Sequence, residues 1–286
     1  MKYIFITGVS SGIGFDAMQK FIYAGYHVIG TVRKEEDLNR MYGTFGNSCT
    51  ILLFDVRDSI KMASEIQKIK PKLEKHGLTC LINNAGMAVP GPLQYLSEED
   101  FELELDVNVK SVRRITNALL PYLGTDKNAS FPPGKIINIS SVSGLFNSPF
   151  NGAYCISKHA LESMTDVYRR ELAMFGIQVI AIEPGPIKTE IWRKNLGALD
   201  KFLNTEYGET LASANKMIEN SEKTALDVEV ISKLIWKIYN DPNPKTRYLV
   251  HRKKLMFRIL SSWLPDKWAD RLVAKAIAQK DNYRPV

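Results

Sequence analysis

The sequence predicts an α/β fold, in which a parallel sheet is covered by helices on both faces. Seven short apolar runs fit β-strands, at 3–7, 27–32, 50–54, 80–84, 135–140, 177–183 and 247–250. Their residues are continuously apolar and do not alternate with polar ones, as expected for strands that are buried on both sides. Longer helical patterns separate these runs, and this alternation predicts βαβ units with right-handed crossovers.

The helical patterns between the strands are regular, apart from two regions. Helices are predicted over 12–25, 35–42, 58–76, 97–123, 152–175 and 227–240. Residues 124–134 form a polar stretch with proline and glycine, which predicts a loop. Residues 184–226 contain no strand-like run and predict a helical insertion over one end of the sheet.

Length and composition are those of a soluble globular protein. The chain has 286 residues, 45% of them hydrophobic and 24% charged, which allows one large α/β domain or two small ones. Cys49, Cys80 and Cys155 show no C-x-x-C spacing and the four histidines are isolated, so we expect neither disulfides nor a metal site. A reducing compartment, the cytoplasm, is therefore expected. We expect no signal peptide, because a strand begins at once, and no membrane span, because no apolar run reaches about 18 residues.

The positive charge is concentrated near the end of the chain. The net charge is +7, and residues 252–280 carry eight basic and two acidic side chains. The body of the chain is therefore close to neutral. A basic stripe over the body is what nucleic-acid binding would require. We expect no nucleic-acid partner.

A glycine-rich turn follows the first predicted strand and opens the first helix. It contains Gly8, Ser10, Ser11, Gly12, Ile13 and Gly14. Glycines allow the backbone to approach a pyrophosphate, and a helix N-terminus supplies N–H groups and a positive dipole. The spacing G-x-x-x-G-x-G matches the commoner G-x-G-x-x-G only in part. A turn that serves only tight strand–helix packing is the alternative.

The ends of the second and third strands predict which dinucleotide binds. A 2′-hydroxyl is usually bound by an acidic residue, whereas a 2′-phosphate favours arginine. The second strand is followed by Arg33 and Lys34, with no acid before Glu35. This favours NADP(H) over NAD(H), although a plain surface pair of cations is the competing interpretation. Asp55 and Val56, after the third strand, are placed to meet the adenine, although Asp55 could equally cap the next helix.

Tyr154 and Lys158 stand four residues apart, and Ser141 lies thirteen residues before Tyr154. On a helix, positions i and i+4 share a face, so the phenol and the ammonium would project side by side. A nearby positive charge favours the phenolate and lowers its pKa from about 10. The tyrosine could then exchange a proton with an alcohol or carbonyl oxygen. A chance surface pair is the alternative.

Taken together, residues 1–250 resemble the short-chain dehydrogenase/reductase family. Its motifs occur in order as Thr7-Gly8-x-x-x-Gly12-Ile13-Gly14, Asn83-Asn84-Ala85-Gly86, Asn108, Ser141, Tyr154-x-x-x-Lys158 and Pro184-Gly185. The resemblance implies a single Rossmann-type domain, a doubly wound parallel sheet of about seven strands in the order 3-2-1-4-5-6-7. Residues 190–225 would form a substrate lid on this domain, and residues 251–286 a basic amphipathic helical extension.

The resemblance also implies a role for each motif residue. Tyr154 would be the acid/base, Lys158 would bind the nicotinamide ribose and lower the tyrosine pKa, and Ser141 would hydrogen-bond the substrate oxygen. Asn108 would hold a water in a proton relay. Cofactor contacts would come from Asn84, Ala85, Gly86, Pro184, Gly185, Ile187 and Thr189.

At two positions the family pattern does not assign a residue or a cofactor directly. The thirteen-residue step to Tyr154 selects Ser141, so that Ser140 and Ser143 become backbone-bonding loop residues. Members that use NADP(H) often carry a basic residue just before the second glycine of the turn. Ser11 stands there, so the cofactor assignment depends mainly on Arg33.

The predicted lid is apolar, with Ile191, Trp192, Leu196, Leu199, Phe202, Leu203, Leu211 and Met217. It suits a lipophilic carbonyl or alcohol, although these side chains could equally pack the lid onto the body. Within the family the chain is most similar to the hydroxysteroid and retinol dehydrogenase branch. The expected function is an NADP(H)-dependent oxidoreductase acting on a steroid, retinoid or long-chain substrate. A reductase of smaller polar carbonyls and a non-catalytic NADP(H)-binding sensor or scaffold are the alternatives.

The C-terminal stretch predicts a pair of basic amphipathic helices. Their apolar faces would contain Leu255, Met256, Ile259, Leu260 and Trp263, and then Trp268, Leu272, Val273, Ala276 and Ile277. Two interpretations remain open: the helices pack on the lid, or they contact a membrane peripherally. The resemblance further implies a homodimer or homotetramer, built on the helices predicted at 97–123 and 152–175.

Overall fold

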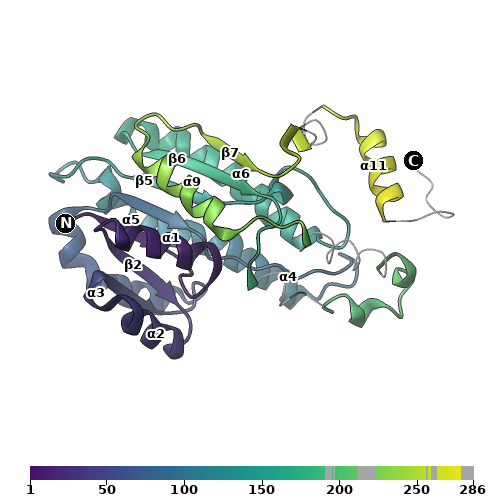
Figure 1. The fold of residues 1–286 in the computed structure, drawn as a ribbon, viewed down its shortest axis with the longest axis horizontal. Coiled ribbons are helices and arrows are strands. Elements are labelled where there is room, and N and C mark those ends of the chain that lie inside the picture. The colour runs from purple at the N-terminus through teal and green to yellow at the C-terminus, as the bar shows by residue number, and fades with distance from the viewer. Residues whose placement is uncertain (191–194, 196, 212–222, 256, 259–262, 278–286) are drawn as a thin grey trace.

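Seven parallel strands form one sheet in the order β3-β2-β1-β4-β5-β6-β7, as predicted (Figure 1). The computed structural model describes residues 1–190, 195, 197–211, 223–255, 257, 258 and 263–277. The strands are β1 (Tyr3–Ile6), β2 (His27–Val32), β3 (Cys49–Leu53), β4 (Cys80–Asn83), β5 (Lys135–Ile139), β6 (Gln178–Pro184) and β7 (Arg247–Val250). Each strand predicted from the sequence is present, with ends that differ by no more than one residue.

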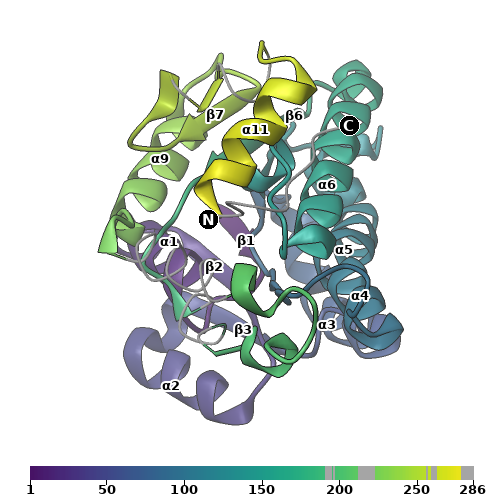
Figure 2. The ribbon, with the colours of Figure 1, turned by 90° about the vertical axis from the view of Figure 1, so that its right-hand side faces the viewer.

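Helices cover both faces of this sheet (Figures 1 and 2). They include α1 (Gly12–Tyr23), α2 (Glu35–Phe45), α3 (Ser59–His76), α4 (Glu98–Leu105), α5 (Ser111–Leu120), α6 (Gly152–Glu171), α9 (Val228–Asn240) and α11 (Asp266–Ala276). Apolar residues of α1, α2 and α9 form a core with one face, and those of α3, α5 and α6 form a second core with the other. The continuously apolar strands therefore contribute to two cores at once.

The helix predicted over 97–123 is interrupted. Ser97 begins α4 as its N-cap, because its hydroxyl accepts a hydrogen bond from the Asp100 N–H at 3.1 Å. A π-helical turn, Asp106–Lys110, then separates α4 from α5. Such turns are often found at functional sites. This one contains Asn108, one of the predicted site residues.

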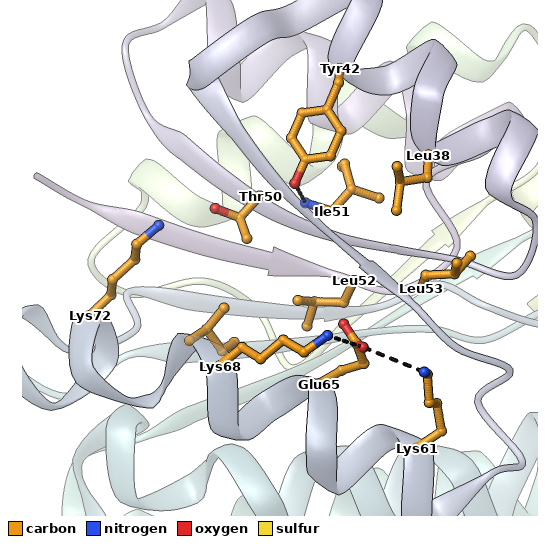
Figure 3. Close-up of a pocket in the computed structure, with 11 residues that line it drawn as sticks. Leu38, Tyr42, Thr50, Ile51, Leu52, Leu53, Lys61, Glu65, Lys68 and Lys72 are labelled. Atoms are coloured by element: carbon orange, nitrogen blue, oxygen red, sulfur yellow. Dashed lines mark hydrogen bonds and ion pairs between the residues drawn. The ribbon is translucent and has the colours of Figure 1, made fainter.

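A pocket of about 430 Å³ lies along β3, at one edge of the sheet (Figure 3). It is lined by residues of α2, β3 and α3, and the Tyr42 hydroxyl accepts a hydrogen bond from the edge N–H of Ile51 at 3.1 Å. Lys61, Lys68 and Lys72 are also in its wall. Lysines beside an exposed edge oppose pairing with a further strand. None of the predicted site residues lines this pocket.

The described part of the predicted lid has a small core of its own. Leu199, Phe202 and Leu211 are buried together, with Phe150 and Tyr207 packed against them. Leu203 is 40% exposed. Leu199, Phe202 and Leu211 therefore pack against one another and against Phe150, which lies outside the predicted lid. Ile191, Trp192, Leu196 and Met217 lie outside the described residues.

The C-terminal segment leaves the sheet after β7, and α11 lies outside the layered body (Figures 1 and 2). Ala274 and Ile277 are buried, whereas Trp268 is 60% and Leu272 50% exposed. Met256, Ile259 and Leu260 lie outside the described residues. Across the part of the chain that is described, no helix has the length and apolar character needed to cross a membrane.

Candidate active site

The backbone of the glycine turn is not covered by side chains of its own glycines. Gly8 and Gly12 have φ values of 71° and 59°, which favour glycine. A Cβ on Gly14 would lie 2.2 Å from the Gly8 carbonyl oxygen, so no side chain fits there. The Gly8 N–H donates to the Thr31 hydroxyl at 3.0 Å, which ties the turn to β2.

Asn84 fixes the turn from the other side. Its side-chain amide donates to the carbonyl oxygens of Thr7 and Gly8, at 2.9 and 3.0 Å. The N–H groups of Asn84 and Ala85 both donate to the Thr7 hydroxyl at 2.9 Å. Four hydrogen bonds therefore join the residues that follow β1 and β4.

The N-terminus of α1 fits a bound phosphate group. Ser11 stands at the N-cap position with extended backbone, and its side chain makes no capping hydrogen bond. A helix N-terminus without a side-chain cap keeps N–H groups available for an anion. The open glycine backbone and this helix end together fit the pyrophosphate of a dinucleotide, the cofactor type that the sequence predicts.

Around the end of β3, Asp55 is held by an arginine that the sequence did not single out. Its carboxylate accepts hydrogen bonds from Arg57 Nε at 3.0 Å and Nη2 at 2.9 Å. Burial opposes ionisation, but the Arg57 hydrogen bonds and the charge of Arg33 keep the pKa of Asp55 below its ordinary value. The α3 N-cap is Asp58, which accepts from the Lys61 N–H at 2.8 Å, so Asp55 does not cap that helix. Val56 is buried beside it.

The three predicted catalytic side chains of the serine–tyrosine–lysine set come together between β5 and α6. Tyr154 and Lys158 lie on α6, with the Lys158 Nζ 5.6 Å from the tyrosine ring centre. The same ammonium donates to the Ile139 carbonyl oxygen at the end of β5, at 2.9 Å. Ser141, just after β5, accepts a hydrogen bond from the Ser143 N–H at 3.1 Å. A chance surface pair is excluded, because Lys158 is only 5% exposed.

The electrostatics of this set differ from the expectation. Burial raises the pKa of Tyr154 to about 12, with an opposing contribution from the Ser141 hydroxyl. Burial likewise lowers the pKa of Lys158 to about 8. The predicted lowering of the tyrosine pKa by lysine is therefore absent in this arrangement. The reason is that desolvation penalises both charged forms, and the Lys158 ammonium is bonded to a backbone carbonyl.

Asn108 is fully engaged at the π-helical turn. Its Oδ1 accepts from the Met87 N–H at 3.0 Å, and its Nδ2 donates to the Met87 carbonyl and the Ser157 hydroxyl, both at 2.9 Å. It thereby joins the loop after β4 to α6, next to Lys158. Gly86 completes this corner, since a Cβ there would lie 3.3 Å from the Asn108 Oδ1.

The segment after β6 adjoins the glycine turn. Thr189 lies against Gly12, where a Cβ would meet its methyl group at 3.3 Å. Ile187 is buried and forms an isolated β-bridge with Leu226. Gly185, which follows Pro184, packs against His251, whose ring carbon would lie 2.3 Å from an added Cβ. The predicted cofactor residues of this segment therefore lie at the carboxyl end of β6, next to the turn.

Glu104 is a buried carboxyl that the sequence reading missed. It lies one turn before Asn108 and is completely buried, and its Oε2 accepts the Val89 N–H at 3.3 Å. Its Oε1 has no hydrogen-bond partner within the described part of the chain. Burial raises the pKa of Glu104 to about 8, with the Val89 hydrogen bond and the charge of Lys158 opposing. The i, i+4 step to Asn108 was a signal that could have revealed it.

Replacing Glu104 by glutamine should stabilise the protein in alkaline solution. The folded-state pKa lies above the unfolded one, so ionisation of Glu104 costs stability as pH rises from about 4.5 to 8. Glutamine keeps an acceptor for Val89 without a charge. We expect Glu104→Gln to match the wild type at pH 5 and to exceed it by about 2–4 kcal/mol at pH 9. Thermal melts over this pH range measure the difference, and an equal shift at every pH would contradict it.

Comparison with known proteins places this site in a family. The sequence profile described as short chain dehydrogenase matches residues 2–198. The chain therefore belongs to the short-chain dehydrogenase/reductase family, and it is a hydride-transferring oxidoreductase of that family by similarity to its members.

Three relatives with similar sequences are named for different substrates. The chain is 40% identical to the NADPH-dependent 3-dehydrocapnine reductase of Ornithobacterium rhinotracheale, over 96% of this chain and 97% of that protein. It is 32% identical to the 3-ketodihydrosphingosine reductase of Bacteroides thetaiotaomicron, covering 93% and 94%. Retinol dehydrogenase 16 of Homo sapiens is 31% identical, covering 95% and 87%, which agrees with the branch expected from the sequence.

Solved structures share the architecture. A short-chain dehydrogenase from Streptomyces avermitilis superposes with a TM-score of 0.76 at 24% identity, over 90% of each chain, and so shares the fold. ElxO, solved with NADP bound, has a TM-score of 0.69 at 28% identity and covers 87% of this chain and 96% of its own.

Proposed function

We propose that this protein is an NADP(H)-dependent oxidoreductase that interconverts a carbonyl and an alcohol on a lipophilic molecule. The observation that carries the proposal is the set of Ser141, Tyr154 and Lys158 between β5 and α6, in which Ser141 and Lys158 are buried. Asn108 is hydrogen-bonded to Ser157, the residue before Lys158. Residues 1–250 would act as one catalytic domain with a lid at 190–225, and residues 251–286 as an extension.

The side chains divide the work of the reaction. Nicotinamide, when bound, supplies or accepts the hydride. The Ser141 hydroxyl donates a hydrogen bond to the substrate oxygen, and the Tyr154 hydroxyl gives that oxygen its proton in reduction or removes it in oxidation. Lys158, held beside Tyr154 by the Ile139 carbonyl oxygen, binds the ribose of the nicotinamide. Asn108 holds the loop after β4 against α6 so that this geometry persists.

Preference for NADP(H) is supported by charge at the ends of β2 and β3. Arg33 is exposed directly after β2, and its charge reaches Asp55. No acidic residue stands at the end of β2 to bind a 2′-hydroxyl. The name of the relative that is 40% identical includes NADPH dependence, which supports the same preference.

A ketone on a long or bulky apolar molecule is the proposed substrate class. Two relatives are named for a 3-dehydro and a 3-keto substrate, and a third for retinol. A smaller polar carbonyl and a non-catalytic cofactor-binding role remain the alternatives. The latter would leave the intact Ser141, Tyr154 and Lys158 set without a function.

The proposal is tested by following NADPH absorbance with a panel of carbonyls. Long-chain 3-oxo compounds, a steroid ketone and retinal represent the lipophilic class, and small hydroxylated ketones the polar class. We expect turnover with at least one lipophilic member and little with the polar set. Turnover only of polar carbonyls would overturn the substrate class, and NADPH binding without turnover of any would favour the sensor.

Self-association through α6 is part of the proposal. Ile156 and Val167 are 42% and 45% exposed and lie eleven residues, or about three turns, apart, so they share one face of the helix. An exposed apolar stripe on a long helix fits pairing with a second copy. Sedimentation velocity should show a dimer or tetramer, and a monomer at all concentrations would reject it.

We further propose that α11 contacts anionic membranes peripherally. Trp268 and Leu272 are exposed one turn apart, and Arg271 and Lys275 follow each of them by three residues on the same side. The exposed apolar side chains could enter the lipid boundary, and the neighbouring cations, on long flexible stems, could reach anionic headgroups. The protein itself would be cytoplasmic, which suits three buried free thiols.

Vesicle co-sedimentation tests the membrane contact. The full chain should bind vesicles that contain phosphatidylserine, weakly or not at all without it, and less as salt rises. Trp268→Glu should reduce binding about tenfold, whereas Met174→Glu, an exposed apolar site on another segment, should not. Packing of α11 on the lid, the other interpretation, predicts no binding by any variant.

A further inference from the structure

Arg40 reaches the glycine turn from a neighbouring helix, although no motif singled it out. It lies on α2, yet its Nη2 donates to the Ser10 carbonyl oxygen at 2.6 Å. The same nitrogen pairs with the Asp37 carboxylate at 2.6 Å, one turn earlier on the helix. The guanidinium carbon also lies 5.9 Å from the ring centre of Phe15, the residue after Gly14. Three contacts therefore hold a side chain that is 48% exposed.

These contacts place a positive charge where the glycine turn meets β2. The turn is bonded to β2 through the N–H groups of Gly8 and Val9, which donate to the Thr31 hydroxyl and carbonyl oxygens at 3.0 and 3.1 Å. Arg33 follows two residues after Thr31. The turn that Arg40 contacts is therefore bonded to β2 two residues before Arg33.

Arg40 keeps donors for a further partner. A guanidinium has five N–H donors in a planar fork that matches the oxygens of a phosphate. Only Nη2 is engaged, and Nε and Nη1 have no hydrogen-bond partner among the residues that the structure describes. Because the side chain is already held in place, less conformational freedom is lost when it binds an anion.

We infer that Arg40 is a second cation of the cofactor 2′-phosphate site and helps to select NADP(H) over NAD(H). The inference rests on the proposed cofactor preference. It adds a preorganised guanidinium on α2 to Arg33, and it assigns Asp37 the task of orienting that guanidinium. It also explains how the site can bind a 2′-phosphate with Ser11, and no basic residue, before the second glycine.

A purely structural role for Arg40 makes a different prediction. If the guanidinium served only to stabilise the glycine turn, its loss would weaken every dinucleotide alike. A 2′-phosphate contact concerns only NADP(H). The ratio of the two affinities therefore separates the two roles, whereas the affinity for NADPH alone would not.

The experiment titrates nicotinamide fluorescence with NADPH and NADH on the full chain. We expect Arg40→Gln to weaken NADPH binding by about tenfold or more and NADH binding less than about twofold. Arg40→Lys should fall between, because it keeps charge without the fork. Arg170→Gln, the same charge change on α6, is the matched control and should alter neither. Arg33→Gln with Arg40→Gln should leave NADPH bound no more tightly than NADH.

Titration calorimetry with fragments of the cofactor measures the contribution of the contact between Arg40 and the 2′-phosphate. Arg40→Gln should weaken 2′,5′-ADP and leave 5′-AMP unchanged. An equal loss for both fragments, or no loss for either, would overturn the inference. Wild-type protein that binds NADH as tightly as NADPH would instead overturn the proposed cofactor preference, so the two failures are distinguishable.

Discussion

Tyr154→Phe should reduce kcat by about 100- to 10,000-fold while NADPH binding changes little. The substitution removes one oxygen and with it the proton that the substrate oxygen needs. The ring remains, so its position on α6 and its packing near Lys158 are kept. Loss of a proton donor acts in the transition state, and KM for a carbonyl substrate should therefore change far less than kcat.

Tyr168→Phe is the matched control. It also removes a phenol oxygen from α6, but that hydroxyl donates to Asn117 Oδ1 at 2.7 Å, away from the serine–tyrosine–lysine set. We expect near wild-type turnover and a small loss of stability, about 1 kcal/mol, from the missing hydrogen bond. Turnover by Tyr154→Phe above about a tenth of the wild-type rate would contradict its assignment as proton donor.

Among the substitutions considered for this protein, Arg247→Met should lower the free energy of unfolding the most. Arg247, on β7, pairs with Glu162 at 2.9 Å and Asp166 at 2.8 Å on α6, and with Glu183 at 3.4 Å on β6. Glu162 and Glu183 are less than a tenth exposed. Removing the cation leaves three neighbouring carboxylates without a positive charge between them. We expect the free energy of unfolding to fall by about 2–4 kcal/mol. This is less than for a fully buried pair, because Arg247 is partly exposed.

The loss of stability in Arg247→Met should depend on pH, and the direction of that dependence distinguishes a loss of charge from a loss of packing. Burial, together with the charge of Glu162, already raises the pKa of Glu183 to about 7. Without Arg247 the pKa of Glu183 rises further above its unfolded value, and the pKa of Asp166 loses the lowering that Arg247 contributes. The destabilisation is therefore present at pH 8 and shrinks towards pH 4 as these carboxyls protonate. Adding Glu183→Gln should recover part of the loss. Denaturant titrations at several pH values measure both effects.

Arg113→Met serves as the control for this loss. Arg113 is exposed on α5 and makes no ion pair in the described part of the structure. Its replacement should change stability by less than about 0.5 kcal/mol at any pH. A loss for Arg247→Met that is independent of pH would mean that packing of the arginine stem, and not charge, carries its contribution.

The sheet could be predicted from the sequence because each strand is buried on both faces and therefore apolar throughout. The π-helical turn at 106–110 could not, because the residue types of a single turn do not distinguish an i→i+5 from an i→i+4 hydrogen bond. The pairing of Tyr154 with Lys158 follows from spacing alone. Their pKa values do not, because burial depends on the loops that cover α6.

Residues whose importance depends on contacts between distant parts of the chain could not be predicted from the sequence either. Glu104 stands in an acid-rich stretch that resembles a solvated helix face, but in the fold it is buried and bonded to Val89 in the loop after β4. Arg40 and Arg247 each act through partners at other places in the chain, Ser10 for the first and Glu162 for the second. Spacing rules detect neighbours on one element, but they do not detect which elements meet.

The contact between Phe202 and Gly91 has a consequence for protein engineering. A Cβ on Gly91 would lie 2.8 Å from the Phe202 ring, so the proposed lid and the loop that contains Gly91 are in close contact at this point. The lid is also joined to the same loop by Tyr207, which donates to Gln94 at 3.0 Å. Earlier in that loop, Met87 and Val89 bond to Asn108 and Glu104. A lid transplanted from a relative to change specificity should therefore be exchanged together with residues 87–96, as one cassette.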